Sequence, residues 1–142
     1  MALTRTFRSV GPDDETDSQR ESAKRAMVAG NVIIGFVVLF MLVDGIMKVL
    51  QFDVSVEGTL EFGYPRSFVA WIGLTLVICT LLYAIPRTAF LGAILLTAYL
   101  GGATAIQLRI EQSDFIFAVF FGVLVWVGLS LRDARLRPLI FR

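Results

Sequence analysis

Four long stretches without a charged residue constrain this chain more than any other feature of its sequence. A helix needs about 20 residues to cross the hydrocarbon core of a bilayer, with a range of about 17–25. Only helices and closed barrels satisfy their backbone groups in lipid, and these stretches lack the alternation of barrel strands. With the apolar extension of the first stretch to Leu50, the sequence predicts transmembrane helices at about 26–50, 67–85, 88–108 and 115–131.

The overall composition agrees with a membrane location. Hydrophobic residues make up 56% of the chain and charged residues 18%, against about 45–50% and about 25% in an average soluble protein. A soluble fold of this size cannot hide so much apolar surface, so the excess must face lipid. We therefore predict an all-α fold, an integral membrane antiparallel four-helix bundle, in which the lipid bilayer is the first partner.

The connections between the runs are short. Pro86 removes a backbone donor and ends the second helix, and Thr88 is placed to cap the third. This tight hairpin makes the second and third helices neighbours. Between Phe52 and Phe62 the apolar residues recur every four positions, which favours a short helix in the interface, but the alternation around Val54 suits a strand equally well.

The amino-terminal 25 residues differ from the rest of the chain. They carry five basic and five acidic side chains and few apolar ones, a composition typical of disorder. We expect a disordered charged tail over 1–25, a four-helix domain over 26–137 and a short carboxyl-terminal end over 138–142. A cleaved signal peptide fits poorly, because the first apolar run exceeds the h-region length of about 7–15 residues and no A-x-A-like site follows it.

The distribution of Lys and Arg predicts the orientation. With the amino terminus inside, the outer side carries only Lys48, Arg66 and Arg109, and all the other basic residues lie inside. This asymmetry satisfies the positive-inside rule. Both termini are therefore expected in the cytoplasm, in a multi-pass topology.

The residue types that are absent exclude much chemistry. The chain has no histidine and one cysteine, Cys79, so a histidine-based triad and an internal disulfide are excluded. We assign no catalytic residue and no metal site. Enzyme activity of the chain on its own is disfavoured, because it would need a bound cofactor or a partner. The chain has neither a phosphate-binding loop nor a basic patch with interleaved aromatic residues, so we expect no nucleic-acid partner.

Two charged residues lie within the first predicted helix. Asp44 and Lys48 are four apart, so they share one face, and the acid-first order is the favourable one. Lys48 can extend to the outer surface, but Asp44 lies about one turn deeper and needs a partner. The pair is either an internal ion pair that fixes the first helix or a polar site for a substrate, a quinone head group or a proton.

Gln107 and Arg109 end the third helix on the same outer side. Counting along antiparallel helices places them at a depth comparable with Asp44 and Lys48, with Glu111 at the rim. We therefore name Asp44, Lys48, Gln107 and Arg109 as candidate ligand-binding residues. One interpretation is that Arg109 binds a negatively charged ligand group, such as a carboxylate or another oxyanion. The alternative is that it is an ordinary arginine at the membrane interface.

Small residues recur every fourth position along the third helix. Such ridges let helix backbones approach closely in lipid. They predict packing within the bundle, with a dimer face and hence a homo-oligomer as the alternative. The residues concerned are Ala89, Ala93, Thr97, Gly101 and Ala105, beside a second ridge that includes Gly102.

Several sequence blocks occur in a fixed order along the chain: Asp44-Gly45-Ile46-Met47-Lys48, Gly63-Tyr64-Pro65, Trp71-Ile72-Gly73, Ile85-Pro86-Arg87-Thr88, Leu91-Gly92-Ala93-Ile94-Leu95-Leu96-Thr97, Tyr99-Leu100-Gly101-Gly102-Ala103 and Leu131-Arg132-Asp133. Together these blocks resemble the DoxX-like family of small bacterial four-helix membrane proteins. The resemblance covers about 31–137. Relatives often carry a histidine shortly after the Gly-Gly-Ala, where this chain has Gln107, so a role based on that histidine does not carry over.

The resemblance implies a function in a bacterial cytoplasmic (inner) membrane. The family is named after a subunit of a thiosulfate:quinone oxidoreductase, and some relatives associate with oxidative-stress enzymes. It therefore implies a non-catalytic accessory subunit or scaffold of a membrane redox complex, whose partner is a membrane or soluble oxidoreductase. The alternative is quinone or small-anion binding or transport at the outer polar pocket. Quinone is then the one cofactor implied, and the chain itself carries none.

Overall fold

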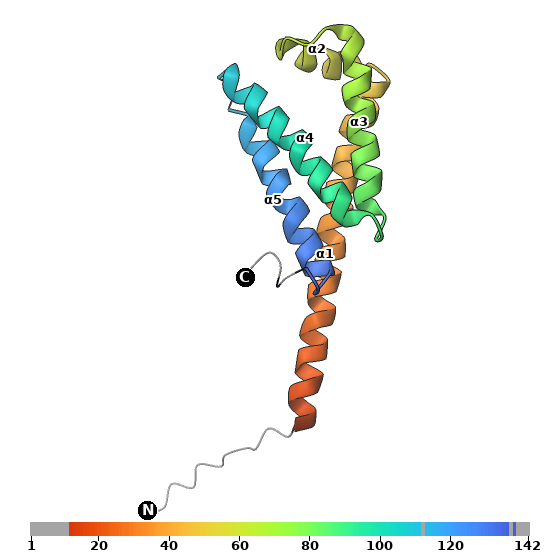
Figure 1. Ribbon diagram of the computed structural model, residues 1–142, viewed down its shortest axis with the longest axis vertical. Helices are drawn as coiled ribbons and strands as arrows, with labels where there is room; N and C mark the ends of the chain where they lie inside the picture. The colour runs from red at the N-terminus through yellow and green to blue at the C-terminus, as the bar shows by residue number, and fades with distance from the viewer. Residues whose placement is uncertain (1–11, 112, 137, 139–142) are drawn as a thin grey trace, which may run out of the picture.

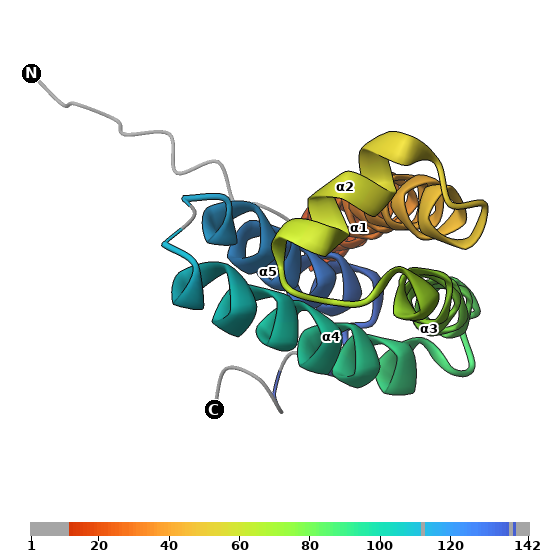
Figure 2. The same ribbon diagram turned by 90° about the horizontal axis from the view of Figure 1, so that it is seen from above.

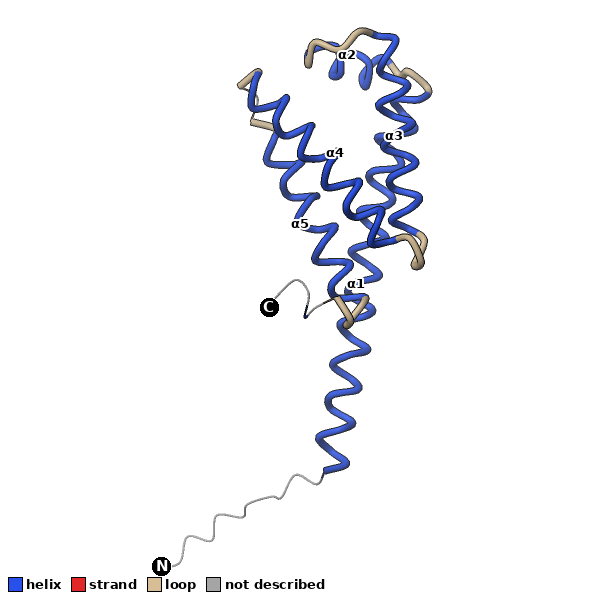
Figure 3. Tube along the Cα trace, in the orientation of Figure 1, coloured by secondary structure: helices blue, strands red, loops and turns tan. Residues whose placement is uncertain are grey.

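The computed structural model describes residues 12–111, 113–136 and 138. This part of the chain is helical and contains no strand, which confirms the all-α prediction (Figures 1 and 3). The elements in chain order are α1 (Pro12–Val49), α2 (Asp53–Glu61), α3 (Arg66–Ala84), α4 (Ala89–Arg109) and α5 (Phe115–Arg132).

The four long helices form a ring in the order α1, α3, α4, α5. Helix α1 packs against α3 and α5, and α4 packs against the same two neighbours, so α1 and α4 lie diagonally opposite (Figure 2). The start of the bundled part of α1 and the end of α5 lie at the same end, since a Cβ on Gly30 would come within 2.7 Å of the backbone nitrogen of Arg132. The bundle is therefore antiparallel.

Each long helix is long and apolar enough to cross a membrane. Large apolar side chains such as Leu39, Trp71 and Ile116 stay exposed on the outside of the bundle. In water this surface would be unfavourable, whereas in lipid it matches its surroundings. The prediction of four spans is confirmed, and their ends lie within one residue of the expected positions for α3, α4 and α5.

The core is built from side chains with no exposed surface. Val37, Leu76, Leu96 and Val125 meet between the four helices, and the ring of Tyr83 lies among them. The Tyr83 hydroxyl donates a hydrogen bond of 2.8 Å to the backbone carbonyl of Val125, which joins α3 to α5. The single cysteine, Cys79, is buried in the same cluster as a small apolar residue.

The first helix begins earlier than expected. Residues 12–25 are helical, so the expectation of a disordered tail is corrected for this range. The rest of the expected tail, residues 1–11, lies outside the described residues. The same holds for the expected carboxyl-terminal end over 138–142, apart from Pro138. A helix already nucleated in the membrane segment is extended at little cost, because each added residue gains a backbone hydrogen bond. An ion pair of 2.7 Å between Glu21 and Arg25 supports the extension, which projects beyond the other helices (Figure 1).

The segment between α1 and α3 is the helix α2, so the helical alternative for this segment is confirmed and the strand is not formed. Its buried side is Val56 and Thr59, whereas Phe52 and Leu60 are exposed. Helix α2 contacts α1 and α3 and makes no comparable contact with α4 or α5.

The turn between α3 and α4 follows from Pro86. Proline has no N–H to donate to the carbonyl of Leu82 one turn earlier. The Thr88 hydroxyl donates to that carbonyl instead, at 2.8 Å, and makes no capping bond to α4. Thr88 thus precedes α4 as expected, but its hydroxyl bonds to a free backbone carbonyl at the end of α3 instead of capping α4.

The small-residue ridge packs along only part of its length. Ala89 and Ala93 are buried, and Thr97 accepts a hydrogen bond of 2.9 Å from the indole of Trp126 on α5. Gly101 and Ala105, farther along the same ridge, are exposed. The packing face is therefore shorter than predicted, because α4 diverges from α3 toward its carboxyl end (Figure 1).

Gly92, outside the predicted ridge, makes the tightest approach of α4 to α3. A Cβ at this position would collide with the backbone of Tyr83. This close contact between the two helices lies beside their short connection.

Candidate functional site

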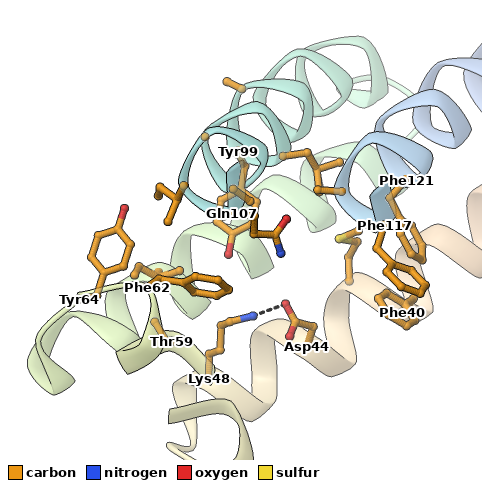
Figure 4. Close-up of a pocket in the computed structure, with 18 residues that line it drawn as sticks. Phe40, Asp44, Lys48, Thr59, Phe62, Tyr64, Tyr99, Gln107, Phe117 and Phe121 are labelled. Atoms are coloured by element: carbon orange, nitrogen blue, oxygen red, sulfur yellow. Dashed lines mark hydrogen bonds and ion pairs between the residues drawn. The ribbon is translucent and has the colours of Figure 1, made fainter. Parts of the chain in front are cut away.

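A cavity of about 500 Å³ lies between the diagonal helices α1 and α4, in the half of the bundle that faces α2 (Figure 4). This volume lies within the range of about 300–1,000 Å³ that is typical of small-molecule sites. Most of the wall is apolar, and much of it is aromatic. The aromatic lining residues are Phe40, Phe62, Tyr64, Tyr99, Phe117 and Phe121.

One wall of the cavity carries the ion pair predicted from the sequence. The Lys48 ammonium donates to carboxylate oxygen Oδ2 of Asp44, one helical turn away on α1. The Lys48 side chain is only 16% exposed, whereas Asp44 is 39% exposed. The ammonium group is therefore largely covered, whereas part of the carboxylate stays accessible.

Two polar side chains of α4 face this pair. In Figure 4 the hydroxyl of Tyr99 and the amide nitrogen of Gln107 are directed across the cavity toward Asp44 and Lys48. The side-chain oxygen Oε1 of Gln107 is buried and has no hydrogen-bond partner among the described residues. A buried acceptor without a donor is unfavourable, and in Figure 4 this oxygen is turned away from the ion pair.

Arg109 lies outside the cavity, contrary to the expected convergence of four polar residues. Its side chain is exposed, and it is absent from the lining. The reason is the helix period: two residues along a helix turn the side chain by about 200°, so Arg109 and Gln107 point to opposite sides of α4. Glu111, expected at the rim, is exposed in the turn after α4 and also does not line the cavity.

The cavity also includes residues that the sequence interpretation missed. Tyr99 lines the cavity from α4, where Arg109 was expected. Ala103 and Ile106 follow Tyr99 by four and seven residues, so these three residues share one face of α4. Phe40 lies one turn before Asp44 on the same face of α1 and stacks on Phe121, with ring centroids 4.4 Å apart. Helical spacing from the polar residues was therefore the signal that could have found them.

The charges of the site balance. One carboxylate and one ammonium line the cavity, and they are paired with each other. No cluster of three or more potential metal ligands occurs within the described ranges. The arrangement can hold a neutral, mostly apolar molecule whose polar end forms hydrogen bonds with Asp44, Tyr99 and Gln107.

Comparison with known proteins identifies the family. No curated protein and no solved structure matches the chain, but the DoxX-like family model matches residues 32–128. This range contains every residue that lines the cavity. The match covers more than half of the chain, and its four apolar helices agree with a multi-pass membrane protein. The chain belongs to the DoxX-like family.

Proposed function

We propose that this protein is an accessory subunit of a membrane redox complex and that its cavity binds the head group of a quinone-class molecule. The observation that carries the proposal is the cavity itself, which joins an aromatic wall to one polar end inside an apolar bundle. A quinone has the same division, since a flat ring with polar oxygens is attached to an apolar tail.

The aromatic walls support a planar ligand. Phe40, Phe117 and Phe121 lie together on one side of the cavity in Figure 4, and rings of this kind stack on other rings. Tyr99 and Gln107 lie on the opposite side with groups that bind ring oxygens. The shape and chemistry of the cavity thus favour a ring between α1 and α4.

The charge balance favours a neutral ligand over a small anion. Lys48 is already paired with Asp44, and Arg109, the cation expected to hold an anion, is exposed outside the cavity. An anion would also meet the exposed carboxylate of Asp44, and like charges repel. The small-anion alternative therefore receives no support from the site.

The residue types of the chain support an accessory role. It contains no histidine, and its one cysteine is buried in the core. Electrons would therefore pass between the bound quinone and an oxidoreductase partner rather than through side chains of this protein. The excess of basic residues before the membrane part of α1 and after α5 favours a cytoplasmic location for this end of the bundle, in a bacterial inner membrane.

A matched pair of glycines tests the binding site. Gly102 lines the cavity, whereas its neighbour Gly101 does not, and a Cβ at either position would meet no atom within 4 Å. In full-length protein reconstituted in nanodiscs, we expect Gly102→Phe to weaken binding of a decyl-substituted benzoquinone by at least about tenfold. Gly101→Phe should bind like the wild type. Equal binding by both variants would exclude this cavity as the site.

The redox-complex role needs a separate experiment. The tagged protein should be purified at native expression in mild detergent, and the proteins that co-elute should be identified by mass spectrometry. We expect a stoichiometric oxidoreductase. A chain that always purifies alone would contradict the accessory-subunit role while leaving the cavity as a binding site.

A further inference from the structure

We infer that the ligand of this cavity carries a hydrocarbon tail, which leaves the cavity between α3 and α4 and lies in the bilayer. The inference rests on the proposed function, because it narrows the quinone class to lipid-type molecules and assigns a path to the tail. It also gives Ala98 and Gly102 of α4 a role, as the residues between which and α3 the tail passes.

Two small residues form the edge of the cavity on α4. Ala98 and Gly102 line the cavity and are also exposed on the surface of the protein. Residues with both properties lie where a cavity meets its surroundings, and a Cβ on Gly102 would meet no atom within 4 Å. On the neighbouring helix α3, the half-buried side chain of Ile72 also lines the cavity. An opening with apolar edges therefore lies between α3 and α4, on the side where the two helices diverge (Figure 1).

The depth of this opening matches the hydrocarbon core of a bilayer. Ala98 lies near the middle of α4, a span of 21 residues from Ala89 to Arg109. Gln107 follows Ala98 by nine residues, which corresponds to about 14 Å along a helix. The polar part of the cavity is thus close to the end of the span, and the opening is closer to the bilayer centre. A molecule with a polar ring and an apolar tail satisfies both parts at once.

The opposite side of the cavity, between α1 and α5, is occupied by aromatic rings. Phe40 of α1 stacks on Phe121 of α5 with ring centroids 4.4 Å apart, and the ring of Phe36 lies 6.0 Å from that of Phe121. Phe121 is only 5% exposed, so these rings are packed between their helices. A tail on this side would have to displace stacked rings, whereas the edge at Ala98 and Gly102 carries no bulky side chain.

Photochemical labelling tests the path of the tail. The full chain in nanodiscs is irradiated with a decyl-substituted benzoquinone that carries a diazirine in the tail, near the ring, and the labelled residues are mapped by mass spectrometry. We expect labels around Ile72 on α3 and around Ala98 and Gly102 on α4, and excess unlabelled decyl-benzoquinone should remove them. Labels that are removed in this way but lie only around Phe40 and Phe117 would overturn this path and leave the cavity as the binding site.

A pair of α4 variants provides an independent test. Ala98→Leu narrows the opening, so we expect it to weaken binding of decyl-benzoquinone by at least about tenfold and binding of the same benzoquinone without its decyl chain by less than about twofold. Ala105→Leu is the matched control, because Ala105 is exposed on α4 and does not line the cavity. Equal changes for the two ligands in Ala98→Leu would overturn this inference alone. Failure of both ligands to bind the wild type would overturn the proposed function together with it.

Discussion

Gly45 on α1 and Gly73 on α3 lie against each other where these two helices cross. A Cβ built on Gly73 would come within 2.7 Å of the Gly45 carbonyl oxygen and 2.6 Å of Lys48 Cβ. Without a side chain at either position, the two backbones come into direct contact, as small residues allow in membrane helices. This contact fixes α1 one residue from Asp44, so it also positions the ion pair in the cavity wall.

Filling this crossing should destabilise the protein. We expect Gly73→Ala to lower the free energy of unfolding by about 1–3 kcal/mol, because the new methyl group overlaps the backbone of α1. The measurement is denaturant unfolding in mixed micelles. Gly35→Ala is the matched control, since nothing lies within 4 Å of its Cβ position. A Gly35→Ala loss as large as that of Gly73→Ala would contradict the close crossing.

The hydrogen bond from Tyr83 to Val125 gives a second prediction. Tyr83→Phe keeps the buried ring and removes the donor, so we expect a loss of about 0.5–1.5 kcal/mol in unfolding free energy. Tyr64→Phe should change stability less, because the Tyr64 side chain makes no hydrogen bond with another residue of the described part of the chain. The same unfolding assay compares the two variants, and a smaller effect at Tyr83 would argue against the bond.

The contact between Thr97 and Trp126 gives a third prediction. Thr97→Val keeps the shape but removes the acceptor for the indole N–H, and bonds of this kind in membrane proteins contribute about 0.6 kcal/mol on average. Thr75→Val is the control, because the Thr75 hydroxyl bonds only to its own helix. Ultraviolet resonance Raman of the indole N–H should report the loss in Thr97→Val and no change in Thr75→Val.

The ion pair gives a fourth prediction. Lys48→Met leaves the Asp44 carboxylate without its partner in a mostly apolar cavity, so we expect a loss of about 1–3 kcal/mol. Replacing both residues, as Asp44→Asn with Lys48→Met, should cost less than Lys48→Met alone, because no unpaired charge remains. A double-mutant cycle measures the coupling. Additive losses would show that the two side chains do not interact.

Much of the fold could be predicted from the sequence because lipid imposes a simple requirement. Every backbone group must be satisfied within its own helix, so the uncharged runs end where the helices end. The beginning of α1 could not be predicted in this way. Composition indicates how much apolar surface a segment can bury, and residues 12–25 have little of it. They are helical because they continue a helix that is already formed in the membrane segment.

The site was only half predictable. The spacing of Asp44 and Lys48 gave the ion pair, and depth in the membrane placed Gln107 near it. Depth alone does not determine which way a side chain points, and this is why Arg109 was included and Tyr99 was missed. The rotation of α4 about its own axis depends on its packing against α3 and α5, which involves residues far apart in the sequence.

The one-sided attachment of α2 has a consequence for access to the cavity. Thr59 of α2 and Phe62 just after it line the cavity, yet α2 contacts α1 and α3 and not the pair on the other side. The segment over this end of the cavity is therefore attached to α1 and α3 alone. An outward tilt of α4 and α5 would separate them from this segment and open the cavity laterally to the bilayer, so that a lipid-dissolved molecule could enter without crossing water.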